Sequence, residues 1–139
     1  SRDFPNILED IHLNKKQINE MLDMGHSIGV HTHTHISVSA TSLSKDEFYH
    51  EMILPKKILE SEFNVSIISF SYPFGQKKDC LSSIQLLEHT KEYKLGFTVE
   101  EIINSEKISP LEIGRYQPKG NENVMSLTNS LSNIIKKNN

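Results

Sequence analysis

The sequence predicts an α/β protein built on a mainly parallel sheet or on part of a barrel. Short apolar, β-branched segments alternate along the chain with longer segments whose apolar residues recur at helical spacing. This alternation is typical of βα units, in which a helix follows each strand and covers the sheet. The 139 residues contain no internal repeat, low-complexity tract or interdomain linker. We therefore expect one domain over residues 1–139.

The first predicted helix and strand lead directly to a cluster of histidines. Asn14, with Gln17 three residues later, forms a capping-box pattern for a helix over residues 15–24. Residues 26–31 follow, and their β-branched residues and nearby glycines predict a short buried strand. That strand runs into a loop that carries the histidines.

A long helical segment and a second strand come next. Ser44 is the expected N-cap, and Pro55 lies inside the apolar pattern, so this helix should kink or divide there. The apolar, β-branched residues 65–70 predict a buried strand. Residues 71–75, which contain proline and glycine, predict a turn directly after it.

The second half of the chain continues the same alternation. Residues 79–92 predict a helix with Leu81, Ile84, Leu86 and Leu87 as core positions. Residues 95–99 and 111–116 predict two further strands. A final helix is expected over residues 121–137, with an inward face formed by Val124, Leu127, Leu131, Ile134 and Ile135.

Composition narrows the possible functions. The net charge is -3 with neutral histidines, so electrostatics give no support for nucleic-acid binding. Cys80 is the single cysteine, which excludes an internal disulfide and a cysteine-rich zinc site. No apolar run approaches the length of a membrane span. The first residues lack a starting methionine and a signal-peptide core, which we interpret as a processed or truncated end; the parent protein could be exported or attached to the cell envelope.

The histidine cluster is the first candidate for chemistry. His31, His33 and His35 alternate with threonines, and neutral imidazole is a common ligand of zinc and similar divalent ions. His31 and His35 can converge on one ion if the segment turns, and all three share a face if it stays extended. A polar loop that is merely rich in histidine and threonine fits the spacing equally well.

Residues 25–35, Gly-His-Ser-Ile-Gly-Val-His-Thr-His-Thr-His, resemble the second motif of the polysaccharide deacetylases, also called the NodB or carbohydrate esterase 4 family. That motif reads His-Ser/Thr-x-x-His after a Gly-His-x-Ile-Gly strand, and the chain matches it without a gap. The resemblance implies that His31 and His35 bind the metal and that Thr32 helps to order the loop. His33 falls at a variable position, so it faces outward or only supports the ligands.

Residues 71–75, Ser-Tyr-Pro-Phe-Gly, resemble the third motif of the same family, Arg-x-Pro-Phe/Tyr-Gly. The resemblance implies that Phe74 lines the substrate groove and that its backbone N–H helps to bind the oxyanion. Tyr72 and Pro73 are expected to contact substrate with it. Ser71 stands where the fullest version of the motif has arginine, which weakens the active-site network.

The resemblance extends over roughly residues 14–135, and its two motifs are specific as an ordered pair. Residues 94–101 are similar to the segment that returns to the sheet, and residues 113–116 to a late strand that carries arginine. By resemblance Arg115 reaches the groove and binds substrate, whereas taken alone it is expected to form a surface salt bridge. The implied fold is a partial, distorted (β/α) barrel of the NodB type that lacks its first strands.

Two elements of the family pattern have no counterpart in the sequence. The first motif, Thr-Phe-Asp-Asp, would supply the catalytic base and the third metal ligand, and the late Leu-x-His motif would supply the general acid. The base and the acid are therefore not present in this chain, and the expected site holds two of three ligands.

The implied activity is metal-dependent removal of N-acetyl groups from an amino-sugar polysaccharide, with zinc as the expected metal. We expect this chain to be incomplete or inactive by itself. Two alternatives remain: a non-catalytic remnant that binds metal or glycan, and a hydrolase of small amides on the same fold. An incomplete sheet would also expose an edge through which the chain could self-associate.

Overall fold

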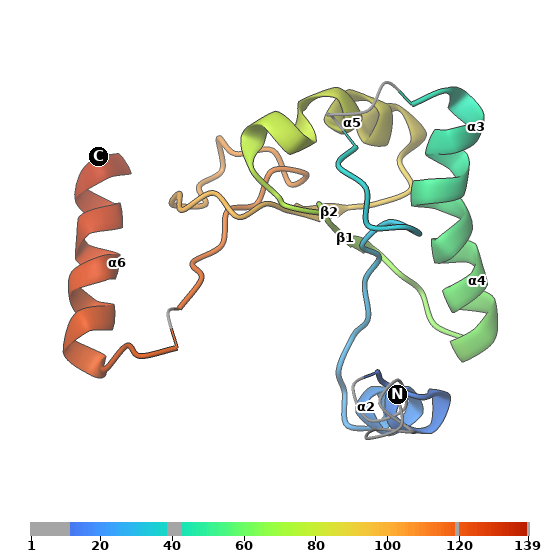
Figure 1. Cartoon of the computed structure of the whole chain (residues 1–139), viewed down its shortest axis with the longest axis horizontal. Helices are drawn as coiled ribbons and strands as arrows, with labels where there is room; N and C mark the ends of the chain where they lie inside the picture. Colours follow the sequence, from blue (N-terminus) through green and yellow to red (C-terminus); the bar gives the residue numbers. More distant parts are fainter. Residues whose placement is uncertain (1–11, 39–42, 119, 139) are drawn as a thin grey trace, which may run out of the picture.

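The computed structural model describes residues 12–38, 43–118 and 120–138 (Figure 1). Within these residues no helix is long and apolar enough to cross a membrane. The helices are α2 (Lys15–Asp23), α3 (Lys45–Phe48), the π-helix η1 (Tyr49–Ile53), α4 (Leu54–Phe63), α5 (Lys77–Thr90) and α6 (Val124–Asn138). The strands are β1 (Ser69–Ser71) and β2 (Leu95–Phe97).

A small parallel sheet forms the centre of the fold. β1 pairs with β2 in parallel, with Phe70 opposite Gly96. One isolated parallel bridge joins Val30 to β1, and another joins Ile113 to β2. Four segments thus lie side by side, and α5 connects β1 to β2 as a crossover helix (Figure 1). The expected α/β alternation with parallel pairing is confirmed.

The strands are shorter than the sequence predicts, for local reasons. The segments 26–31 and 111–116 each pair at a single bridge. The segment 65–70 forms strand only from Ser69, because the Ile67 N–H is taken by the side chain of Glu60 in α4 at 2.8 Å. Backbone groups that bind side chains are unavailable to a strand ladder.

Gly96 lets the chain after β2 approach the sheet closely. A Cβ at this position would lie 2.5 Å from the Leu111 carbonyl oxygen, so only glycine fits. The Gly96 N–H donates to Pro110 O, and Ile113 N–H donates back to Gly96 O. This contact places the chain after Leu111 beside the sheet.

The long helical segment begins and breaks where the sequence predicts. Ser44 and Glu47 form the capping box, and Asn64 ends the segment with a left-handed backbone. Pro55 has no N–H to donate to a carbonyl four residues earlier. The preceding turn is a π-helix in which Leu54 N–H donates to Tyr49 O, so the interruption precedes Pro55.

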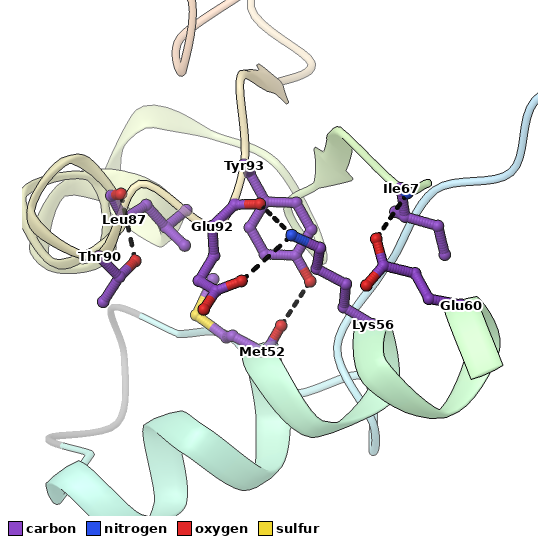
Figure 2. Close-up of polar contacts among 8 residues, drawn as sticks. All are labelled: Met52, Lys56, Glu60, Ile67, Leu87, Thr90, Glu92 and Tyr93. Atoms are coloured by element: carbon purple, nitrogen blue, oxygen red, sulfur yellow. Dashed lines mark hydrogen bonds and ion pairs between the residues drawn. The ribbon is translucent and has the colours of Figure 1, made fainter. Parts of the chain in front are cut away.

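The segment just before β2 contacts this helix through hydrogen bonds and an ion pair (Figure 2). The Tyr93 hydroxyl donates to the Met52 carbonyl at 2.5 Å. Lys56 Nζ donates to the backbone carbonyl of Glu92 and forms an ion pair with its carboxylate at 3.1 Å. Because Tyr93 precedes β2, these contacts tie η1 and α4 to the sheet.

One cluster of buried side chains forms the core between the sheet and the helices: Val30, Val38, Phe48, Met52, Ile53, Ile67, Phe70, Tyr72, Cys80, Ile84, Leu87, Tyr93 and Leu111. The predicted core positions Ile84 and Leu87 are confirmed, whereas Leu86 is exposed because it lies on the outer face of α5. The predicted inward face of α6 is wrong for Val124, Leu131 and Ile135, which are exposed. α6 stands away from the sheet, so little covers it (Figure 1).

Candidate active site

The histidine loop begins where the Val30 segment leaves the sheet. Val30 N–H donates to Ser69 O at 3.1 Å, and Ser71 N–H donates to Val30 O at 2.9 Å. These bonds place His31 beside the carboxyl end of β1, where the turn at residues 71–75 starts. Two segments that are 40 residues apart in the sequence therefore meet at one edge of the sheet.

The two predicted metal ligands lie next to each other. The His31 and His35 ring centroids are 4.8 Å apart, with the rings nearly perpendicular. His31 Nδ1 lies 2.6 Å from the Ser71 carbonyl oxygen, which only accepts, so Nδ1 carries the proton. The lone pair of Nε2 is then free to act as a ligand. Both imidazoles are exposed.

Phe74 belongs to the same cluster. Its ring centroid lies 5.2 Å from that of His35 in an edge-on contact, and its side chain is 60% exposed. The preceding residues are anchored, because Tyr72 N–H donates to Phe97 O in β2. Among the described residues, the Phe74 N–H donates no hydrogen bond, which leaves that donor available to a ligand.

Four residues at this site have a left-handed backbone conformation. Thr32 and His35 have φ of 61°, Phe74 has φ of 62° and Gly75 has φ of 67°. A left-handed backbone costs a residue with a side chain about 1–2 kcal/mol, so surrounding contacts must hold the three non-glycine residues. The hydroxyl of Thr32 is buried, and no described residue makes a hydrogen bond to it.

Two of the predicted substrate-contacting residues lie in the core instead. Tyr72 and Pro73 are almost fully buried, and the Tyr72 hydroxyl donates to Leu111 O at 2.9 Å. Burial raises the pKa of Tyr72 well above its ordinary value. Both side chains therefore hold the turn onto the sheet, and their contact with substrate stays a prediction.

Among the residues that the structure describes, Arg115 forms no salt bridge and has no contact with the histidines. Its Nε donates to Thr98 O at 2.7 Å, and its guanidinium lies 5.9 Å from the centroid of the Phe97 ring. Phe97 and Thr98 follow one another at the end of β2. Arg115 thus packs beside β2 and holds the segment after Ile113 against the sheet.

A family model described as polysaccharide deacetylase matches residues 6–98. The match includes both the histidine loop and the turn at residues 71–75, which the structure brings into contact through His35 and Phe74. The chain belongs to the polysaccharide deacetylase family. Proteins of this family are deacetylases, so the predicted enzyme class of the parent family is confirmed.

The solved structure of a deacetylase has a similar fold. It is the Streptococcus pyogenes deacetylase PplD in complex with acetate, which is 28% identical in sequence with a TM-score of 0.68. The alignment covers 86% of this chain and 51% of that one, so the chain spans about half the length of this relative. No match was found among curated proteins.

The side chains at this site fit a divalent metal in part. Two exposed imidazoles, one with its tautomer fixed by a backbone carbonyl, have the chemistry of metal ligands. Within residues 12–38, 43–118 and 120–138, no three histidine, cysteine, aspartate or glutamate side chains gather as a complete set. His33 lies in the same loop and is exposed.

Sequence reasoning missed one residue at the site, Glu51 of η1. Its carboxylate accepts hydrogen bonds from the backbone of His33 and Thr34 and from the Thr34 hydroxyl. A signal was present, because Glu51 directly precedes the core residues Met52 and Ile53. The pattern alone could not place it, since the π-helix changes which way each side chain of this turn points.

Proposed function

We propose that this chain is part of a metal-dependent N-deacetylase that removes acetyl groups from an amino-sugar polysaccharide. Family membership supports the reaction class. The observation that carries the metal dependence is the His31 Nδ1 contact with Ser71 O, which turns the other ring nitrogen into a ligand beside His35. The substrate is then an N-acetylated glycan.

His31 and His35 are the proposed ligands of the metal, and zinc suits a pair of imidazoles. When bound, such a metal lowers the pKa of a coordinated water and polarises the amide carbonyl. The backbone contributes by keeping the two rings on one side of the loop. Thr32 and His35 achieve this with their left-handed conformations, which turn the chain between the ligands.

Phe74 is the proposed oxyanion and substrate-contacting residue. Its N–H has no acceptor among the described residues, and the neighbouring bonds from Tyr72 to β2 hold it still. A fixed donor of this kind stabilises the negative charge that develops on the carbonyl oxygen. The exposed ring offers a flat apolar face beside His35 on which a sugar could rest.

The acid and base of the reaction must come from residues that the structure does not assign. No described side chain lies with His31 and His35 as a third ligand. We therefore propose that the 139-residue chain alone releases negligible acetate. Chelator-sensitive acetate release from N-acetylglucosamine oligomers by this chain would contradict that part of the proposal.

Zinc binding tests the proposed ligands directly. His31→Ala and His35→Ala should each weaken zinc binding at least about tenfold, measured by isothermal titration calorimetry, because each removes one of the two imidazoles. His89→Ala is the matched control, since His89 is an exposed histidine on α5. Zinc affinities of the two loop variants equal to that of the control would remove these histidines from the site.

A further inference from the structure

We propose that Glu51 is a positioning residue for the histidine pair. Its carboxylate holds the loop between Thr32 and His35 in the conformation that brings His31 and His35 together. The consequence for metal affinity rests on the proposed function. The effect on the loop itself rests only on the contacts of Glu51.

Both carboxylate oxygens of Glu51 accept hydrogen bonds from the loop. Oε2 accepts from His33 N–H at 3.1 Å and from Thr34 N–H at 2.9 Å. Oε1 accepts from the Thr34 hydroxyl at 2.9 Å. Bonds to an ionised acceptor are stronger than neutral ones. A single side chain thus binds two consecutive residues in the middle of the loop.

The bound residues lie between the two left-handed positions of the loop. Thr32 and His35 both have φ of 61°, and the chain bends at His33 and Thr34. Consecutive N–H groups in such a bend point to the same side and form a concave site for an anion. Here the anion is the Glu51 carboxylate, so its bonds offset the cost of the two left-handed residues that flank them.

The π-helix fixes where Glu51 points. Leu54 N–H donates to Tyr49 O across the wider turn, and the Tyr93 hydroxyl holds the carbonyl of the next residue, Met52. π-turns inside helices are frequent at functional sites because they redirect a side chain. Glu51 is half-buried beside the fully buried Met52, so its backbone is anchored while its carboxylate meets the loop.

An ordinary solvated surface carboxylate would not show this pattern. In the described part of the chain, no lysine, arginine or histidine forms an ion pair with Glu51. The partners of its charge are the two backbone N–H groups and the Thr34 hydroxyl. Glu62 of α4 shows the contrast, since its carboxylate pairs with the exposed Lys15 ammonium and binds no backbone N–H of any described residue.

Zinc titration of three variants of the full 139-residue chain tests the consequence for the metal. Glu51→Ala should weaken zinc binding about tenfold to a hundredfold, as loss of a residue that orients metal ligands does. Glu51→Gln should restore most of the affinity, because its carbonyl oxygen can accept the same two N–H bonds. Glu62→Ala, which also removes one carboxylate, should leave the affinity unchanged.

Nuclear magnetic resonance of the metal-free chain separates this proposal from the proposed function. In Glu51→Ala the His35 ring protons should lose the ring-current shift caused by Phe74, and the His33 and Thr34 amides should exchange faster with solvent. Glu51→Gln and Glu62→Ala should keep the original spectra. The unmodified chain could bind no zinc while Glu51→Ala still loses these signals. That result would refute the metal function and leave the positioning role intact.

Two results would overturn the positioning role. One is a metal-free Glu51→Ala chain whose His35 ring shifts and loop amides match those of the unmodified protein. The other is a Glu51→Gln chain as impaired as Glu51→Ala, which would show that charge rather than the loop contact matters. Circular dichroism and thermal melting of each variant confirm that the fold is retained.

Discussion

Three residues with side chains adopt left-handed backbone at the candidate site: Thr32, His35 and Phe74. Strain of this kind persists only where surrounding contacts impose it, and it gathers at functional sites. The contacts are visible here: Glu51 holds the loop, and the bonds of the turn hold Phe74. Threonine is β-branched, so Thr32 is the residue at which the conformation is least expected.

Cys80 shows the opposite behaviour, that of a residue made inert by the core. It is 1% exposed, and its thiol donates to Gln76 O. Burial, with a smaller effect from the nearby Asp79 carboxylate, raises the pKa of the Cys80 thiol from 9.0 to about 12. The reactive thiolate is therefore suppressed in the folded chain.

We predict that Cys80 reacts slowly with iodoacetamide at pH 8 in the folded protein and rapidly in guanidinium, followed by mass spectrometry. The raised pKa also means that the folded state binds this proton more tightly than the unfolded state. Its contribution to stability is complete below pH 9.0 and is lost as the pH rises towards 12. Equal alkylation rates in the folded and unfolded chain would contradict the burial of the thiol.

At the scale of elements, the helical segment from Lys45 to Phe63 shows what a pattern can and cannot specify. Its capping box and its interruption near Pro55 were predictable, because both depend on neighbouring residues. The π-helical form of the interruption was not predictable from these neighbouring residues. It depends on Tyr93, which lies far away in the sequence and binds the Met52 carbonyl.

We predict that Tyr93→Phe lowers the free energy of unfolding by about 1–3 kcal/mol, measured by urea denaturation. The variant keeps the ring but leaves the Met52 carbonyl without its donor, and an unsatisfied buried acceptor costs this much. Tyr49→Phe is the control, since Tyr49 is an exposed tyrosine of η1. Equal stabilities of the two variants would show that the Tyr93 hydroxyl does not support the π-helix.

At the scale of the whole molecule, apolar surface remains on the outside. α6 exposes Val124, Leu131 and Ile135 along one face, with Val124 82% exposed. The Val30 and Ile113 segments on the outer sides of the sheet each pair at only one bridge. Exposed apolar stripes and open sheet edges both favour association. Both features support self-association of the chain, which stays a prediction.

We predict that the sedimentation coefficient of the chain rises with protein concentration in velocity ultracentrifugation. The double change Leu131→Ser and Ile135→Ser should reduce this rise, because it removes two apolar side chains from the exposed face of α6. Asn129→Ser, an exposed position of the same helix, should leave it unchanged. A single monomeric species at every concentration would refute self-association.

The sequence by itself determined the alternation of helices and strands, the caps and the two motifs at residues 25–35 and 71–75. These features depend on periodicity, on capping chemistry and on short ordered patterns, all of which are local. The match to the polysaccharide deacetylase family confirms the family that these motifs predicted. The roles of His31, His35 and Phe74 stay proposals.

Only the tertiary structure decided which side chains meet. It turned His31 towards Ser71 O, brought His35 to Phe74, and moved Tyr72 and Pro73 into the core. It placed Arg115 against Thr98 and Phe97, and Glu51 on the histidine loop. Each of these contacts joins residues that are distant in the sequence, and their geometry depends on sheet register, left-handed backbone and a π-helix that no local pattern encodes.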